Sequence, residues 1–246
     1  MRRFGLVGYP LRHSFSPAYF ADKFEREGIK GCAYQTYPLE SIRQLIPFIN
    51  DTEGLEGLNV TIPYKQKVIE LLHHADFIVE KIQACNCIKM INGQLFGYNT
   101  DVIGFEKSLL PLLKSNHSNA LILGTGGGAK AVQFVLEKLN IAYSFVSRRQ
   151  SANPDFLNYS DLSGDIIGQN QIIVNTTPVG MLPDVDKCPD INFDFVNQSH
   201  LLYDLIYNPA ETLFLKKGAE RGAITKNGME MLIIQAEESW KIWNDD

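Results

Sequence analysis

The sequence predicts an α/β protein with parallel sheets and two domains. Short apolar segments alternate with longer amphipathic ones in the order strand, turn and helix, which is typical of parallel βα units. The alternation stops at a polar stretch, residues 115–119, and then starts again. A glycine-rich loop at residues 124–129 stands between a strand and a helix. These observations predict an N-terminal α/β domain followed by a Rossmann-like, doubly wound domain.

The first domain is predicted to contain three βα units and a hairpin. Pro17 suits a first helical position with Ser16 as the N-cap, and Gly28 is a typical helix stop. Asn92 and Gly93 are the pair favoured in a type I′ turn, because both positions need positive φ. The predicted strands are residues 4–8, 33–38, 58–62, 86–91 and 94–97, and the predicted helices are 17–28, 40–50 and 64–74.

The second domain is predicted to follow a helix over residues 101–114, whose apolar residues have helical spacing. The last segment, residues 228–243, carries an apolar stripe and should pack against another element. The remaining predicted elements are strands 120–123, 141–146, 171–175 and 201–206 and helix 129–140. We therefore expect one domain at residues 1–101, joined by the C-terminal helix 228–246, and the other at 102–227.

The composition excludes several classes of protein. The 246 residues are 45% hydrophobic and 21% charged, which excludes disorder, collagen and coiled coil. A net charge of −5 argues against nucleic-acid or anionic-membrane partners, so we expect a small-molecule ligand. No apolar stretch reaches the roughly 18 residues of a membrane span. We expect a cytoplasmic protein that is a monomer or a homodimer.

The four cysteines are too few for a disulfide scaffold. Cys85 and Cys87 lack a second cysteine or histidine pair at zinc-site spacing, so no metal is expected. Their alternation instead fits a strand over residues 84–90 with both thiols on one face. The apolar stretch near the N-terminus is interrupted by glycine and proline, so a strand and a turn explain it as well as a signal peptide does.

The loop from Gly124 to Ala129 has the sequence G-x-G-x-x-A in the strand–loop–helix context that dinucleotide binding requires. Gly124 allows the tight turn, Gly126 allows a pyrophosphate to approach the backbone, and Ala129 lets the helix pack on its strand. The amides at the helix N-terminus, including Gly127 and Gly128, then face the phosphates. A glycine-rich turn without a ligand is the alternative.

The strand after this helix is followed by Ser147, Arg148 and Arg149, where an NAD site has an acidic residue for the ribose hydroxyl. A carboxylate repels a 2′-phosphate, whereas a guanidinium binds it through two charge-assisted hydrogen bonds. The sequence therefore favours NADP as the cofactor. A solvated basic loop is the alternative.

Three polar clusters follow first-domain strands, at the edge where open α/β sheets bind ligands. They are Ser14 with Ser16, Asn59 with Thr61 and Lys65, and Asn99-Thr100-Asp101. Hydroxyls, amides and carboxylates of this kind suit a polyol carboxylate. Taken singly, each residue also has a structural explanation, with Ser16 and Asp101 as helix caps and Lys65 as a solvated side chain.

In order and approximate spacing, these motifs resemble those of the shikimate dehydrogenases. The resemblance rests on Ser14-Phe15-Ser16-Pro17, Asn59 to Lys65, Asn99-Thr100-Asp101, Gly124 to Ala129, and Asn227-Gly228 with Met231 and Gln235. It covers nearly the whole chain. It implies reversible, NADP-dependent reduction of 3-dehydroshikimate to shikimate, in the pathway to aromatic amino acids, by a substrate domain and a Rossmann-like NADP domain.

The resemblance also implies roles for single residues. Lys65 and Asp101 match the catalytic pair. On the substrate side, Ser14 and Ser16 match the groups that hold the carboxylate, and Tyr207 matches a tyrosine near it. The groups that contact the ring hydroxyls are matched by Asn59, Thr61, Asn86 and Gln235. On the cofactor side, Ser147 and Arg148 match positions at the 2′-phosphate, and Thr176 and Gly228 match positions near the nicotinamide half.

Some residues beside the matched ones depart from the family pattern. Phe15 replaces a common lysine, Cys87 stands where a threonine usually follows Asn86, and Val102 replaces a frequent glycine. The segment 150–165 is also short. These departures bear on the strictness of substrate choice more than on the reaction.

Several alternatives follow from the same residues. A quinate/shikimate dehydrogenase using NAD or NADP shares most motifs, although the turn at residues 147–149 argues against NAD. A non-catalytic regulator that binds a dinucleotide or a shikimate-like acid need not retain both Lys65 and Asp101. Folate-linked dehydrogenases have no place for the Ser14 and Ser16 pair. If the protein is a dehydrogenase, Lys65 is either one member of an acid/base pair with Asp101 or a positive charge that stabilises the developing alkoxide.

Overall fold

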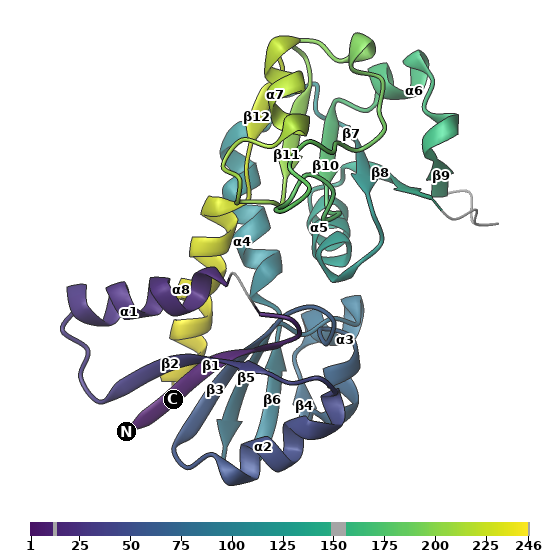
Figure 1. The fold of residues 1–246 in the computed structure, drawn as a ribbon. Helices are drawn as coiled ribbons and strands as arrows, with labels where there is room; N and C mark the ends of the chain where they lie inside the picture. The colour runs from purple at the N-terminus through teal and green to yellow at the C-terminus, as the bar shows by residue number, and fades with distance from the viewer. Residues whose placement is uncertain (12–13, 149–155, 246) are drawn as a thin grey trace. The chain divides into compact units, whose positions relative to one another are not determined.

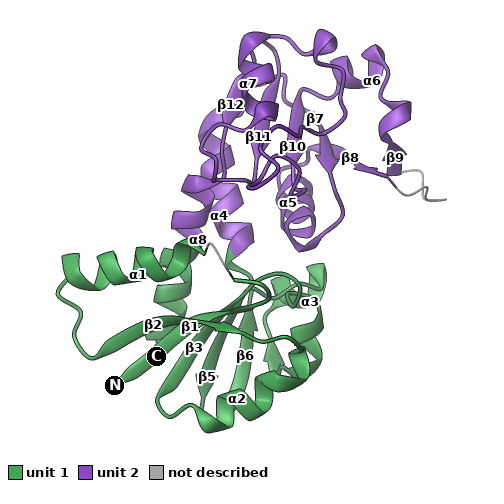
Figure 2. Cartoon of the chain, viewed as in Figure 1, with its two compact units in different colours: residues 1–100, 236–246 green, residues 101–235 purple. Residues whose placement is uncertain are grey.

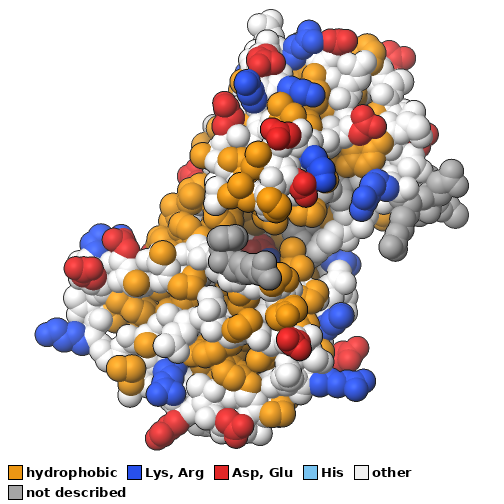
Figure 3. Space-filling view, viewed as in Figure 1, with side chains coloured by type: hydrophobic (Ala, Val, Ile, Leu, Met, Phe, Trp, Pro, Cys, Tyr) orange, Lys and Arg blue, Asp and Glu red, His pale blue; other side chains and the backbone are white. Residues whose placement is uncertain are grey.

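The computed structural model describes residues 1–11, 14–148 and 156–245. The chain divides into two compact units (Figure 2), which are Met1–Thr100 with Ala236–Asp246 and Asp101–Gln235. Each unit has its own six-stranded sheet (Figure 1). Basic and acidic side chains are interspersed on the face of each unit seen in Figure 3. Within the described ranges, no helix is both long and apolar enough to cross a membrane.

The sheet of the first unit has the order β2-β1-β3-β5-β6-β4. Its strands are β1 (Arg2–Gly8), β2 (Cys32–Pro38), β3 (Leu55–Val60), β4 (His74–Ala75), β5 (Cys87–Ile91) and β6 (Gln94–Tyr98). β1 is parallel to β2 and β3, whereas β5 is antiparallel to β3 and β6. Asn92 and Gly93 have φ values of 52° and 77°, so the predicted type I′ hairpin is confirmed.

The helices of this unit differ from the prediction in several places, including a helix over residues 77–82 that was not predicted and a predicted helix 40–50 that is split in two. They are α1 (Phe15–Arg26), η1 (Ile42–Gln44), α2 (Leu45–Asp51), η2 (Lys67–Leu71) and α3 (Phe77–Ile82). The N-cap of α1 is Ser14, with φ −93° and ψ 132°, and the prediction of Ser16 was wrong. Pro17 is tolerated in the third helical position because no N–H of the first turn has an intrahelical partner. The predicted helix 64–74 is a single 3₁₀ segment, because His74–Ala75 pairs with β6 and ends it.

The two faces of this sheet bury separate hydrophobic clusters. One cluster contains Val7, Leu45 of α2, Val79 of α3 and Cys85, and the other contains Phe4, Phe20 of α1, Cys87 and Trp243. The prediction that both thiols lie on one face was therefore wrong, because β5 begins only at residue 87. Phe4 stacks on Trp243 with ring centroids 4.9 Å apart. This stacking attaches the last turns of the C-terminal helix α8 (Met229–Asn244) to the first unit.

The sheet of the second unit is entirely parallel, in the order β12-β11-β10-β7-β8-β9. Its strands are β7 (Asn119–Leu123), β8 (Ala142–Ser147), β9 (Phe156–Asn158), β10 (Ile172–Asn175), β11 (Leu201–Asp204) and β12 (Ile224–Lys226). The chain runs outward from β7 first to one side and then to the other, so β7 and β10 form the switch point of a doubly wound sheet. The predicted Rossmann-like architecture is confirmed.

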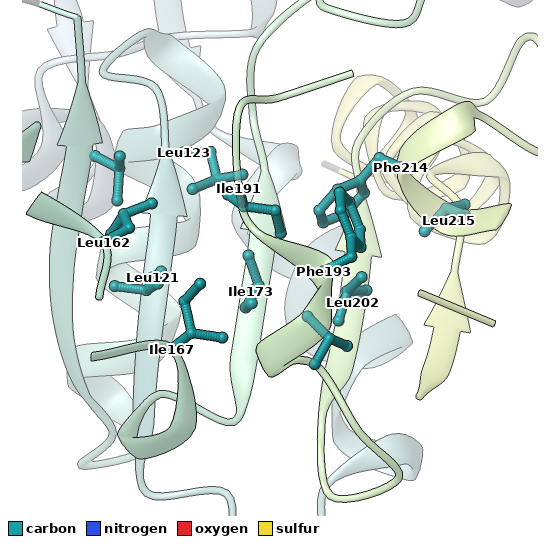
Figure 4. Close-up of a cluster of buried hydrophobic side chains, with 12 residues drawn as sticks. Leu121, Leu123, Leu162, Ile167, Ile173, Ile191, Phe193, Leu202, Phe214 and Leu215 are labelled. Carbon is teal, nitrogen blue, oxygen red and sulfur yellow. The ribbon is translucent and has the colours of Figure 1, made fainter. Parts of the chain in front are cut away.

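Helices cover both faces of this second sheet. They are α4 (Thr100–Leu109), η3 (Leu110–Leu112), α5 (Gly127–Lys138), η4 (Tyr159–Asp161), α6 (Gly164–Gln169), η5 (Phe193–Phe195), α7 (Leu213–Glu220) and the first turns of α8. Figure 4 shows the core on one face, where Leu121, Ile173 and Leu202 pack against Ile167 of α6 and Phe214 of α7. The elements β9, α6, α7 and β12 were not predicted, and β9, α6 and β12 are only three, six and three residues long.

Candidate active site

The predicted substrate residues of the first unit lie near the carboxyl ends of its parallel strands. The Thr61 N–H donates to the Val7 carbonyl at 2.9 Å and so brings the end of β3 beside the end of β1. Ser14 caps α1, and its Oγ lies 3.5 Å from the Leu11 carbonyl. Ser16 is buried in the first turn of α1 and hydrogen-bonds the Tyr34 hydroxyl. Two of the polar clusters predicted from sequence therefore converge on this edge.

Asn59 and Asn86 belong to one buried hydrogen-bond network. The Tyr34 hydroxyl donates to Asn59 Oδ1 at 2.9 Å, and burial raises the pKa of Tyr34, so it remains a donor. Asn59 Nδ2 donates to the Asn86 carbonyl at 3.3 Å and to Ser239 Oγ at 2.8 Å. Asn86 Oδ1 in turn accepts from the Thr100 N–H at 2.7 Å. The network joins three predicted substrate residues, Ser16, Asn59 and Asn86.

Tyr34 and Ser239 were not predicted as part of this site. Tyr34 lies in the middle of β2 and Ser239 on α8, where sequence patterns identify them only as core positions. Their hydroxyls are buried, and a buried hydroxyl requires a hydrogen-bond partner. The rule that buried hydroxyls are hydrogen-bonded indicates that Tyr34 and Ser239 have polar neighbours, but it does not identify those neighbours.

The predicted catalytic pair is divided between the two units. Lys65 is half-buried in the loop after β3, where its carbonyl accepts from the Cys85 N–H at 2.7 Å. Asp101 is buried in the first turn of α4 and begins the second unit. Its carboxylate favours the helix by lying at the positive end of the helix dipole.

The glycine loop of the second unit has the features expected of a dinucleotide site. Gly124 has φ 108°, a conformation that side chains disfavour, and a Cβ there would lie 2.8 Å from Thr176 Oγ1. Gly126 is the N-cap of α5, and a Cβ on it would meet no described atom within 4 Å. Ala129 is fully buried, as close packing of helix on strand requires. Open space beside Gly126 and the free amides of α5 leave room for a phosphate.

The other predicted cofactor residues lie on the same edge of the second sheet. Ser147 ends β8 and Arg148 follows it in an exposed bend, while Arg149 lies outside the described residues. Thr176 follows β10, and its Oγ1 donates to the Leu123 carbonyl at 2.7 Å. Gly127 and Gly128 form the first turn of α5.

Three further predicted residues, Gly228, Gln235 and Tyr207, lie in the second unit. The Gly228 N–H donates to the Ile206 carbonyl at 3.0 Å, and a Cβ there would clash with the Leu205 carbonyl. Gln235 Nε2 donates to the Leu232 carbonyl at 2.9 Å within α8. Tyr207 is half-buried in the loop after β11. Their proposed ligand contacts remain predictions.

A buried carboxylate that the sequence did not single out organises the loops after β10 and β11. Asp204 Oδ1 accepts from Asn175 Nδ2 at 3.1 Å and from the Ile206 N–H at 3.0 Å, and Oδ2 accepts from Thr212 Oγ1 at 2.6 Å. Asn175 Oδ1 accepts from the Thr177 N–H at 3.0 Å. Asp204 thus holds together the segments that carry Thr176 and Tyr207.

Burial raises the pKa of Asp204 from 3.8 to about 6, which makes a testable contribution to stability. The folded chain binds this proton more tightly than the unfolded chain, so the contribution is fully present below about pH 4 and is lost as the pH rises through 6. Asp204→Asn removes this dependence. We expect the stability difference between wild type and variant to change by on the order of 1 kcal/mol between pH 5 and pH 7 in urea unfolding. A difference that is the same at both values would contradict this assignment.

Among the described residues, no group of three or more histidine, cysteine, aspartate or glutamate side chains is arranged to hold a metal ion. Cys32, Cys85, Cys87 and Cys188 are all free thiols.

Comparisons with known proteins identify similar sequences and structures. Residues 6–88 match the family model described as the shikimate dehydrogenase substrate binding domain. A shikimate dehydrogenase (NADP(+)) of Methanococcus vannielii is 37% identical over 97% of this chain and 90% of the relative. The crystal structure of a chorismate mutase/shikimate 5-dehydrogenase fusion protein from Clostridium acetobutylicum is also similar. The match covers 99% of this chain and 91% of that chain, with 34% identity and a TM-score of 0.89.

A further solved structure contains both ligands. It is the shikimate 5-dehydrogenase from Thermus thermophilus in complex with NADP(H) and shikimate, which is 26% identical and has a TM-score of 0.85. The alignment covers 99% of this chain and 94% of that chain. The similarity therefore extends over both units of the chain.

Proposed function

The chain belongs to the shikimate dehydrogenase family, and from this premise we propose that it catalyses the reversible, NADP-dependent reduction of 3-dehydroshikimate to shikimate. The observation that carries the proposal is the buried polar network of Ser16, Tyr34, Asn59 and Asn86. All four residues lie within the segment that matches the substrate-binding family model. The reaction serves the biosynthesis of aromatic amino acids.

The proposed substrate site uses uncharged groups for most of its contacts. Ser14 and Ser16 present hydroxyl groups, which can donate to a carboxylate. Asn59, Thr61, Asn86 and Gln235 present amide and hydroxyl groups, which can pair with ring hydroxyls, and Tyr207 completes the carboxylate side. Binding by neutral donors and acceptors depends on their geometry, so the network that orients the amides matters for selectivity.

Proton transfer is assigned to Lys65 and Asp101. Oxidation of the secondary alcohol requires loss of the hydroxyl proton, and a positioned base contributes typically 10²–10⁴-fold. In this proposal Lys65 accepts that proton or stabilises the developing alkoxide by its charge, and Asp101 is the second member of the catalytic pair. When bound, NADP supplies the hydride chemistry.

The second unit has residues that fit NADP. The loop from Gly124 to Ala129 with the N-terminus of α5 would hold the pyrophosphate, because the space beside Gly126 is open and the N-terminus of a helix favours anions. Ser147, Arg148 and Arg149 would hold the 2′-phosphate, and Thr176 and Gly228 would contact the nicotinamide half. We propose residues 1–101 with 228–246 as the substrate-binding domain and 102–227 as the NADP-binding domain.

A four-way assay tests the proposal. Absorbance of the reduced cofactor is followed with shikimate or quinate, each with NADP+ or NAD+. We expect the highest kcat/KM with shikimate and NADP+. Preference for quinate with NAD+ would favour the quinate dehydrogenase alternative, and binding without turnover in all four mixtures would favour a regulator.

A further inference from the structure

We propose that Ser239 on α8 is a positioning residue for substrate recognition, acting through the amide of Asn59. This inference rests on the proposed function, because it concerns a substrate that carries ring hydroxyls. Ser239 is fully buried and lies in the same compact unit as Asn59. Its hydroxyl accepts from Asn59 Nδ2 at 2.8 Å and lies 3.2 Å from Thr100 Oγ1.

The orientation of the Asn59 amide follows from its neighbours. The Asn86 carbonyl, 3.3 Å away, can only accept, so the Asn59 atom that faces it has to be the nitrogen. Ser239 takes the second hydrogen of that nitrogen. On the opposite side, Tyr34 donates to Oδ1 at 2.9 Å. Both amide hydrogens are thus used within the protein, and the amide can offer a ligand only the remaining lone pair of Oδ1.

The orientation of the Asn59 amide restricts the ligand groups that it can bind. A ligand group that reaches Asn59 has to donate a hydrogen bond, as a hydroxyl does and a ketone does not. Without Ser239, one hydrogen of Asn59 Nδ2 loses its partner in a buried site. An unsatisfied buried donor is energetically costly, and this cost favours rotation of the amide or binding of a water molecule. Ser239 therefore helps to hold Asn59 as an acceptor for a substrate hydroxyl.

Ser239 also links Asn59 to Asn86. Thr100 Oγ1 accepts from Asn86 Nδ2 at 3.0 Å, and the Thr100 N–H donates to Asn86 Oδ1 at 2.7 Å. Because Ser239 contacts both Asn59 and Thr100, one hydroxyl couples the two amides that the resemblance assigns to ring hydroxyls. Such shared networks hold their members in one arrangement more firmly than separate pairs do.

A substitution at the neighbouring residue Cys87 can replace the hydroxyl that Ser239→Ala removes. Cys87 is the direct cross-strand partner of Asn59, so the two side chains lie on the same face of the sheet. The Ser239 hydroxyl hydrogen-bonds the Cys87 thiol. A threonine at position 87 would place a hydroxyl beside the vacated position.

The test compares Ser239→Ala, Ser239→Ala with Cys87→Thr, and Ser108→Ala. Ser108 is a matched control because it is a buried helical serine in the other unit, where its hydroxyl lies 2.7 Å from the Tyr203 hydroxyl. We expect Ser239→Ala to raise KM for shikimate and the calorimetric Kd of shikimate by roughly five- to tenfold, with kcat changed less than about twofold. The added threonine should recover most of this loss, and Ser108→Ala should leave KM unchanged.

Deoxy analogues of shikimate, each lacking one ring hydroxyl, identify the group that meets Asn59. The penalty of Ser239→Ala should disappear for one analogue and persist for the others. Equal penalties for all analogues, an unchanged KM, or a crystal structure of the variant with the Asn59 amide unmoved would overturn the proposal. Turnover of shikimate by the wild type separately tests the proposed function, so failure of the two can be told apart.

Discussion

Lys65→Ala is expected to lower kcat for shikimate oxidation by roughly two orders of magnitude or more, the range typical of a lost acid/base group. The change in KM should be much smaller, because the proposed substrate contacts of Ser14, Ser16 and the amide network do not involve the lysine. Steady-state kinetics with saturating NADP+ measure both parameters. Lys67→Ala is the matched control, since Lys67 is an exposed lysine two residues along the chain.

The same variant distinguishes the two roles left open for Lys65. Added primary amines can replace a missing lysine, and their effect is measured against amine basicity. Rescue that increases with basicity indicates proton transfer, whereas rescue that is independent of basicity indicates stabilisation by charge. If kcat of Lys65→Ala equals that of wild type, Lys65 has neither role.

Much of the fold was predictable because local signals agreed with the final packing. The Asn92 and Gly93 turn and the Gly124 loop each require backbone conformations that few residues adopt, so their sequences are specific. The segment 64–74 was not predictable in the same way. Its apolar spacing fits a helix, but pairing of His74–Ala75 with β6 overrides that preference, and such pairing depends on residues about twenty positions away.

The sequence indicated candidate residues for the site, but not the hydrogen-bond partners that hold them in place. Asn59 and Asn86 stand in recognisable motifs, whereas Tyr34 and Ser239 come from a strand interior and a distant helix. The Ser239 contact spans 180 residues of chain. Asp204 was missed for the same reason, because its partners Asn175 and Thr212 become neighbours only when β10, β11 and α7 assemble.

Arg148→Ala is expected to separate the two dinucleotides. Arg148 is exposed directly after β8, at the edge that carries the glycine loop. A hydrogen-bonded charge pair with the 2′-phosphate contributes about 1.5–3 kcal/mol, which corresponds to roughly ten- to hundredfold in affinity. We therefore expect Kd and KM for NADP+ to rise by that factor, and those for NAD+ to change less than about threefold.

The control for this prediction is Arg221→Ala, which removes another exposed arginine of the same unit, one paired with Asp194. It should change neither cofactor constant. Titration of the free enzyme with each dinucleotide by calorimetry measures binding without turnover, so a loss of activity from another cause does not imitate the result. Equal weakening of NADP+ and NAD+ would mean that Arg148 acts on the shared adenosine or pyrophosphate. A selective loss of NADP+ places the guanidinium at the 2′-phosphate, because this group is the only chemical difference between the two cofactors.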